Sequence, residues 1–165
     1  GSGPCELPAP LHVDVVPVES AADMFEAVKT RAKEQDIIIK AAAVADYTPI
    51  TVNTEKTKKK EGEASIALKR TTDILSWLGE HKEKGQFLCG FSMETENMLE
   101  NSKKKLEKKH ADMIVANNLK VAGAGFGTDT NVVTLITKEG EKELPIQTKD
   151  EVSYEILNEI MNKMA

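Results

Sequence analysis

Short apolar runs alternate with amphipathic segments along the chain. The apolar runs are rich in β-branched or small residues and predict strands at positions 13–18, 37–44, 87–91 and 113–116. The segments between and after them repeat apolar residues at helical spacing and predict helices at positions 20–33, 72–82, 96–110 and 148–164. Strands that alternate with helices indicate an α/β fold with a mainly parallel sheet and right-handed crossovers.

Local signals mark the ends of these elements. Ser20 is followed three residues later by Asp23, and Thr148 by Glu151, which is the spacing of a capping box at a helix start. Near the C-terminus, two strand-like stretches at 132–137 and 142–146 are separated by a short turn that contains a glycine. They predict an antiparallel hairpin at the edge of the sheet.

Apolar periodicity is lost between positions 47 and 64, where Thr, Lys and Glu dominate. Four lysines gather there: Lys56, Lys58, Lys59 and Lys60. A loop of more than about 12 to 15 residues inside a compact domain is usually functional or disordered. We therefore expect residues 47–64 to form a mobile, lysine-rich loop at an active site, followed by a short strand at 66–68.

The composition limits the class of protein. The chain has 165 residues, of which 40% are hydrophobic and 30% charged, and a net charge of -5. These values fit a single globular domain over residues 1–165 rather than a disordered chain. No apolar run approaches the roughly 18 residues of a membrane helix, and Cys5 and Cys89 alone cannot build a disulfide framework. We expect a cytoplasmic domain that binds neither a membrane nor nucleic acid.

Polar residues that follow the predicted strands are candidates for a site, because ligands of open α/β sheets bind beyond the carboxyl ends of the strands. Asp46 follows the run at 37–44, where its carboxylate can bind a base, a ribose or a metal ion; a turn or helix cap explains it equally well. Lys105 and Lys109 are four residues apart and share a helix face. They can hold a polyphosphate, although a solvated surface is the usual role of such lysines.

Other chemistry is not indicated by the sequence. Gly123, Gly125 and Gly127 alternate, but a hairpin rather than a helix follows them, so they do not form a dinucleotide fingerprint. Asp129 and Asn131 close this loop and fit either turn hydrogen bonds or a ligand. The histidines and cysteines lack ligand spacing, so no metal site formed by protein residues is predicted. The residues by themselves indicate a nucleotide-like polyphosphate site.

Six segments carry a further pattern through their order. They are Ala41-Ala42-Ala43-Val44-Ala45-Asp46-Tyr47, Glu55-Lys56-Thr57-Lys58-Lys59, Thr72-Asp73-Ile74-Leu75, Gly90-Phe91 with Glu94-Thr95, Asp112-Met113-Ile114-Val115-Ala116-Asn117, and Gly125-Phe126-Gly127-Thr128-Asp129-Thr130-Asn131. Together with the two lysines, this order resembles that of phosphopantothenoylcysteine synthetase. In bacteria that enzyme is often the C-terminal part of a bifunctional coenzyme A biosynthesis flavoprotein. The resemblance implies a Rossmann-like three-layer sandwich.

The resemblance also implies a reaction. In that family CTP, accompanied by Mg²⁺, activates the carboxylate of 4'-phosphopantothenate as an acyl-cytidylate and releases pyrophosphate. The amine of cysteine then attacks, which gives 4'-phosphopantothenoylcysteine and CMP. FMN is expected only if a decarboxylase domain precedes this domain in the parent protein. The family is dimeric, so a homodimer is expected too.

The roles of individual residues are likewise implied by motif position. Lys56 would stabilise the charge that develops as pyrophosphate leaves, and Ala43 would lie close to the reacting substrate. Nucleotide-binding positions are implied for Ala42, Asp46, Thr72, Asp73, Ile74, Leu75, Phe91, Lys105 and Lys109. A loop that contacts the substrate or the dimer partner is implied for Asn117, Asp129 and Asn131.

The beginning of the chain departs from the family pattern. Family members start with a strand, a glycine-containing turn and a helix, whereas this chain starts near the end of the family's second strand. We expect a piece about the size of a βαβ unit, on the order of 30 residues, to be lacking. The alternative to a ligase is therefore a nucleotide-binding and dimerisation fragment of the enzyme with no turnover of its own.

Overall fold

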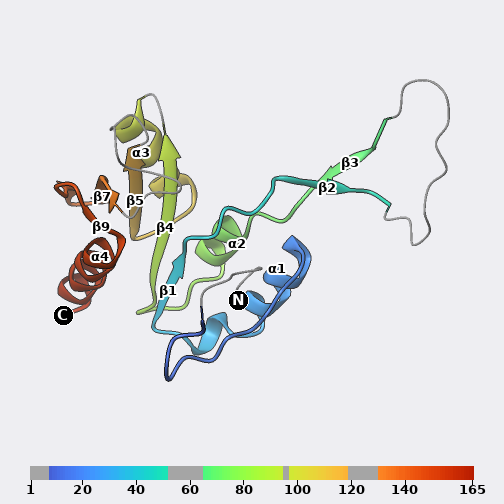
Figure 1. The fold of residues 1–165 in the computed structure, drawn as a ribbon, viewed down its shortest axis with the longest axis horizontal. Helices are drawn as coiled ribbons and strands as arrows, with labels where there is room; N and C mark the ends of the chain where they lie inside the picture. The colour runs from blue at the N-terminus through green and yellow to red at the C-terminus, as the bar shows by residue number, and fades with distance from the viewer. Residues whose placement is uncertain (1–7, 52–64, 95–96, 119–129) are drawn as a thin grey trace. The chain divides into compact units, whose positions relative to one another are not determined.

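The computed structural model describes residues 8–51, 65–94, 97–118 and 130–165 (Figure 1). The chain forms two compact units, which are described separately. Unit 1 comprises Gly1–Thr30 and Ala43–Asp73, and unit 2 comprises Arg31–Ala42 and Ile74–Ala165. The organisation as a single domain stays a prediction.

A five-stranded sheet in the order β1-β4-β5-β7-β8 forms the centre of unit 2. Its strands are β1 (Ile37–Lys40), β4 (Phe87–Glu94), β5 (Met113–Asn118), β7 (Val133–Thr137) and β8 (Gly140–Glu143). β1, β4 and β5 run parallel, whereas β7 and β8 are antiparallel to their neighbours. The predicted α/β fold, with its parallel strands and its C-terminal antiparallel hairpin, is confirmed.

Helices cover both faces of this sheet. On one face, Val152, Ile156 and Ile160 of α4 (Lys149–Met164) pack into the core of the sheet. The strands contribute Cys89 from β4, Met113 and Val115 from β5, and Val133 and Leu135 from β7. The alternate residues of β4 point to the other face. There Gly90 meets Leu75 of α2 (Ile74–Glu80), and Ser92 meets Ser102 of α3 (Met98–Lys108). The three layers are those of a Rossmann-like sandwich (Figure 1).

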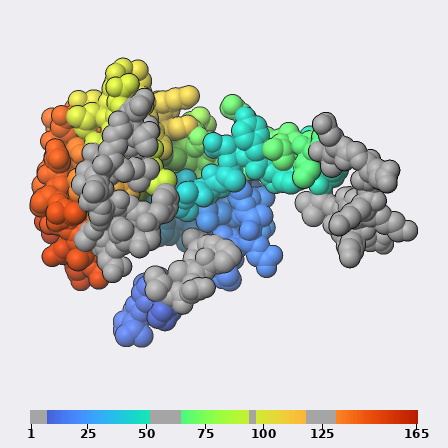
Figure 2. Space-filling model, turned by 45° about the horizontal axis from the view of Figure 1, so that its top comes forward, coloured from blue at the N-terminus to red at the C-terminus, as the bar shows by residue number. Residues whose placement is uncertain are grey.

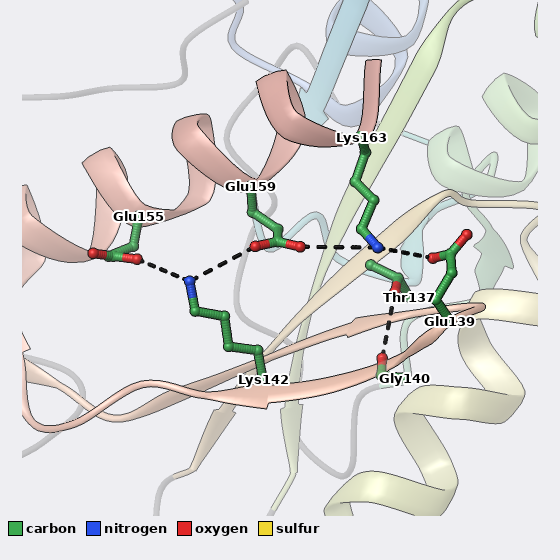
Figure 3. A network of polar contacts seen from close by, with 7 residues as sticks. All are labelled: Thr137, Glu139, Gly140, Lys142, Glu155, Glu159 and Lys163. Carbon is green, nitrogen blue, oxygen red and sulfur yellow. Dashed lines mark hydrogen bonds and ion pairs between the residues drawn. The ribbon is translucent and has the colours of Figure 1, made fainter. Parts of the chain in front are cut away.

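A capping box and ion pairs fix α4 on the sheet. The hydroxyl of Thr148 accepts from the N–H of Glu151, and the N–H of Thr148 donates to the Glu151 carboxylate, so the predicted capping box is present. At the side of the hairpin, Lys142 lies 3.2 Å from Glu155 and 3.7 Å from Glu159 (Figure 3). Lys163 lies 3.9 Å from Glu159 and 3.1 Å from Glu139 in the same network.

Helical spacing predicts that Val152, Ile156, Leu157, Ile160 and Met164 share one apolar face of α4, which is only partly correct. Val152, Ile156 and Ile160 are buried, but Leu157 is 45% exposed and Met164 is 38% exposed. The helix remains on the surface of unit 2, at the orange-red end of the chain (Figure 2). Because a surface helix buries only one stripe of residues, the apolar side chains outside that stripe stay in contact with water. Among the helices that the structure describes, none combines the length and the apolar content of a membrane span.

Two short antiparallel ladders complete the described elements. In unit 1, β2 (Tyr47–Pro49) pairs with β3 (Leu68–Arg70), and α1 (Ala21–Lys29) begins at the predicted Ser20–Asp23 capping box. In unit 2, β6 (Thr130–Asn131) pairs with β9 (Gln147–Thr148), a ladder that the sequence did not predict. A short 3-10 helix follows α1 at Ala32–Glu34.

Four sequence predictions need correction, and the first is the short strand expected at 66–68, which the structure has at Leu68–Arg70. Residues 13–18 form no strand beyond a single bridge at Pro17, and Val13 and Val15 are about half exposed, since they find no ladder among the described residues. The run at 37–44 ends as a strand at Lys40, and Ile39 is 40% exposed because β1 has only β4 as a neighbour in the described sheet. Residues 47–49 belong to β2 rather than to a loop, and residues 52–64 lie outside the described part of the chain.

Candidate functional site

Two of the predicted nucleotide-binding residues contact each other in unit 2. Phe91 lies in the middle of β4, and Lys105 lies on α3, which follows that strand. The Lys105 ammonium donates a hydrogen bond of 2.8 Å to the carbonyl oxygen of Phe91. The contact ties a cation to the backbone of a central strand.

Lys109 is the C-cap of α3 and is held by α2. Its ammonium donates a hydrogen bond of 2.8 Å to the hydroxyl of Ser76. Because side chains on a helix lean toward its N-terminus, Lys105 and Lys109 extend from one face of α3 in the same general direction. Both are anchored on neutral oxygen atoms, one on a strand and one on a neighbouring helix.

The backbone of Lys109 is fixed as firmly as its side chain. His110 follows it at a positive φ of 50°, and Ala111 N donates to the carbonyl of Leu106 at 3.1 Å. His110 N donates to Glu107 O at 3.1 Å, so the end of α3 has the two bonds of a Schellman motif. On α2, Gly79 lies so close that an added Cβ would overlap the carbonyl oxygen of Lys109. The absence of a side chain there lets α2 pack directly on the end of α3.

α3 is also joined to the sheet through a polar contact inside the core. The hydroxyls of Ser92 and Ser102 lie 2.8 Å apart, and the two residues are 3% and 0% exposed. Two residues before Ser92 on β4, a Cβ on Gly90 would come within 2.6 Å of Leu75 and 3.1 Å of Ile114. Since a buried hydroxyl needs a partner, this pair fixes the position of the helix that carries both lysines.

Ile74 and Leu75 are predicted nucleotide-binding residues whose side chains belong to the core. They are 2% and 3% exposed, so a ligand could reach only their backbone in this conformation. Thr72 and Asp73 are exposed and belong to unit 1. The predicted motif at 72–75 therefore spans the boundary between the two units, and its role stays a prediction.

The residues around the predicted Asp46 site are exposed. Ala42 belongs to unit 2, where its carbonyl accepts a hydrogen bond of 2.7 Å from the Lys40 ammonium. Ala43 and Asp46 are exposed residues of unit 1. Within unit 1 the carbonyl of Asp46 accepts from Thr71 N at 2.9 Å. That bond involves only the backbone of Asp46, and the residue itself is exposed to solvent.

Three side-chain amides near the carboxyl ends of the strands have an oxygen without a hydrogen-bond donor among the described residues. The amide oxygens of Asn117, Asn131 and Gln147 are buried, and each accepts no hydrogen bond from the residues that the structure describes. Asn131 and Gln147 stand opposite each other in the β6–β9 ladder, and Asn117 is opposite Val133, at the start of β7. Two of the three residues of the predicted substrate or dimer loop are thus among these amides.

The remaining predicted residues, Lys56 and Asp129, lie outside the described part of the chain. Over the described ranges, no group of three or more His, Cys, Asp or Glu residues is arranged to hold a metal ion. Ser76, Ser102 and Gly79 could not be predicted, since a serine or glycine within a helical pattern carries no signal of a specific contact. Their roles become visible only from the way α2 and α3 pack.

This part of unit 2 suits an anionic ligand. Two ammonium groups on one helix face can each donate to phosphate oxygens, and lysine is a common binder of phosphates. On the opposite side of the sheet, burial raises the pKa of the Cys89 thiol to about 12, with a smaller contribution from the negative charge of Asp112. A thiol of that kind is no nucleophile at neutral pH.

Comparisons with known proteins point to one family. Residues 2–164 match the DNA/pantothenate metabolism flavoprotein C-terminal domain. The chain is 53% identical over 161 residues to the coenzyme A biosynthesis bifunctional protein CoaBC of Bacillus subtilis (strain 168), covering 96% of the chain and 39% of that protein. It is 44% identical over 161 residues to a cysteine/cysteine sulfinic acid decarboxylase of an unknown prokaryotic organism, covering 96% of the chain and 45% of that protein.

A solved structure supports the same grouping. The crystal structure of the C-terminal domain of a CoaBC protein superposes with a TM-score of 0.80 at 49% identity. The match covers 98% of the chain and 73% of that domain. The chain spans less than half the length of the two curated relatives, which have different names. Those names describe longer proteins and do not by themselves assign an activity to the shared part.

Proposed function

Because the chain belongs to the family of DNA/pantothenate metabolism flavoprotein C-terminal domains, we propose that it is the phosphopantothenoylcysteine synthetase part of a coenzyme A biosynthesis enzyme. The observation that carries the proposal lies in unit 2. Lys105 and Lys109 share one face of α3 and are each anchored by a neutral oxygen, on Phe91 and Ser76. Anchored cations of this kind suit the triphosphate of a nucleotide.

The proposed reaction joins 4'-phosphopantothenate to cysteine. The carboxylate of 4'-phosphopantothenate attacks the α-phosphorus of CTP, pyrophosphate leaves, and an acyl-cytidylate forms. The amine of cysteine then attacks the acyl carbon and loses a proton, and CMP leaves with the electrons of the broken bond. Activation is needed because a free carboxylate is a poor acyl donor, whereas a nucleotide monophosphate is a good leaving group.

Residues of this chain would act mainly by binding and by electrostatic stabilisation. Lys105 and Lys109 would neutralise phosphate oxygens, and Lys56 would meet the charge that grows on the departing pyrophosphate. Nucleotide contacts stay proposed for Ala42, Asp46, Thr72 and Asp73 and for the backbone of Ile74 and Leu75, and a contact with the reacting substrate stays proposed for Ala43. Mg²⁺ would be bound to the triphosphate and would supply further charge neutralisation there.

The amides at the carboxyl edge fit the proposed substrate contacts. Buried amide oxygens that lack donors within the described residues are satisfied when a ligand or a second protein chain supplies N–H groups. The amide oxygens of Asn117, Asn131 and Gln147 are of this kind, which supports the proposal for the first two and adds Gln147 to it. Asp129 remains part of the same proposal. We propose a homodimer as the working form, which sedimentation of the protein over a range of concentrations would test.

A second candidate is nucleotide binding without turnover. It rests on the same two anchored ammonium groups, which suit the binding of phosphates without requiring that a reaction follows. An assay of CMP formation from CTP and Mg²⁺ separates the two candidates. CMP that appears only when 4'-phosphopantothenate and cysteine are both present supports the ligase. CTP binding with no CMP supports the second candidate, and a chain that neither binds nor converts CTP contradicts both.

A further inference from the structure

We propose that Ser76 is a positioning residue, which holds the Lys109 ammonium in the orientation that receives the phosphates of a nucleoside triphosphate. The inference rests on the proposed nucleotide binding and adds to it a residue outside the family motifs quoted above. Its basis is the hydrogen bond of 2.8 Å from Lys109 Nζ to Ser76 Oγ, which joins residues 33 positions apart. The bond is partly buried, so water competes with it less than at an open surface.

The two ends of the Lys109 side chain are fixed by the same helix. At the backbone end, Gly79 packs against the Lys109 carbonyl, and at the ammonium end Ser76 accepts a hydrogen bond. Ser76 and Gly79 are three residues apart on α2 and therefore lie on one face of that helix. The left-handed His110 fixes the chain direction directly after Lys109. The arrangement therefore fixes the backbone of Lys109 and the end of its side chain.

Fixing this side chain matters because lysine has a long, flexible stem. A free lysine loses much rotational entropy when it binds a ligand, whereas one that is already oriented loses less. The hydroxyl of Ser76 is uncharged, so its bond orients the ammonium without adding a negative charge beside it.

Calorimetric titration with CTP and Mg²⁺ tests the proposal in four variants of the chain: Ser76→Ala, Ser76→Thr, Lys109→Met and the double variant Ser76→Ala/Lys109→Met. Alanine is the best helix former, so Ser76→Ala should keep α2 folded, which its unchanged melting temperature would verify. We expect Ser76→Ala to raise the Kd for CTP about three- to tenfold, the range for immobilising one long side chain. Ser76→Thr keeps the hydroxyl and should bind as the unsubstituted chain does.

The double variant distinguishes positioning from a structural effect. If Ser76 acts through Lys109, adding Ser76→Ala to Lys109→Met should change the Kd by less than about twofold. If the two residues contributed independently, the fold-changes in Kd of the two single variants would multiply in the double variant. Unaltered CTP binding by Ser76→Ala, failure of Ser76→Thr to retain affinity, or multiplied effects in the double variant would each overturn the inference and leave the proposed function intact. An unsubstituted chain that does not bind CTP would overturn the proposed function and the inference with it.

Discussion

The ammonium of Lys105 lies 2.8 Å from the carbonyl oxygen of Phe91, a residue fourteen positions earlier in the chain. The contact joins the helix α3 to the middle of β4 and brings together two residues that the sequence assigned to nucleotide binding. It also leads to a test, because the preceding lysine on the helix contacts a side-chain carboxylate rather than a strand carbonyl. Lys104 forms an exposed ion pair with Glu100, one helical turn away.

Replacing Lys105 with Met should weaken the binding of CTP. A hydrogen bond from a charged group contributes about 1.5–3 kcal/mol, so the Kd should rise about 10- to 150-fold in a calorimetric titration. Lys104→Met removes the same charge from the same helix and serves as the matched control. Equal effects of the two substitutions would show that only the net charge of α3 matters, which contradicts a specific role for Lys105.

Gly79→Ala should destabilise unit 2. The added Cβ would overlap the Lys109 carbonyl oxygen, and because its two nearest neighbours are backbone atoms of Lys109, there is little room to relax. Overpacking of this kind costs about 1–3 kcal/mol, partly offset by the better helix propensity of alanine. Urea denaturation would measure the loss, with Glu80→Ala as a control at an exposed position of the same helix. A Gly79→Ala chain as stable as the control would refute the close packing of α2 on α3.

The capping box of α4 should make stability depend on pH. The N–H and hydroxyl of Thr148 hold the pKa of Glu151 below its ordinary value of 4.5, because both stabilise the carboxylate. Since the folded pKa is lowered, the stabilisation is present above about pH 4.5 and is lost as the pH falls through the folded value. Glu151→Gln keeps a hydrogen-bonding side chain but not the charge.

Melting temperatures of the two proteins between pH 7 and pH 3 would reveal this dependence. The unsubstituted chain should melt higher near pH 7, and the difference should shrink below pH 4.5 as Glu151 takes up a proton. A difference that stays constant over the whole range would mean that the carboxylate charge does not stabilise the start of α4.

Cys89 should resist thiol reagents while the protein is folded. The residue is 0% exposed, and burial raises its pKa to about 12, so at pH 8 only about one thiol in ten thousand is ionised. In a Cys5→Ser variant, iodoacetamide should therefore modify the chain only after denaturant is added, which mass spectrometry would detect. Modification of the native protein within minutes would contradict the burial of β4 between its helical layers.

The sequence predicted the elements of unit 2 well because their signals are local. Thr148 and Glu151 of the capping box lie three residues apart. The paired strands β7 and β8 are separated by only a short turn. The strand predicted at 37–44 was too long, since a run of isoleucine and alanine fits a buried strand whether or not a second neighbour pairs with it. The burial of β1 depends on neighbouring strands, which periodicity cannot show.

The candidate site was only partly predictable for a related reason. Lys105 and Lys109 were found because a four-residue spacing defines a helix face, and Phe91 came from a resemblance to a family. Ser76 and Gly79 act through contacts with a residue about 30 positions away, and nothing in their own surroundings in the sequence marks those contacts. Ile74 and Leu75 show the reverse case, in which a motif names residues whose side chains are buried in the core.

Calorimetric titration of the chain with CTP, ATP and UTP, each with Mg²⁺, tests the central claim most directly. We predict binding at a single site with a clear preference for CTP, weakened by Lys105→Met and preserved in Lys104→Met. The absence of CTP binding, or equal affinity for the three nucleotides, would contradict the account.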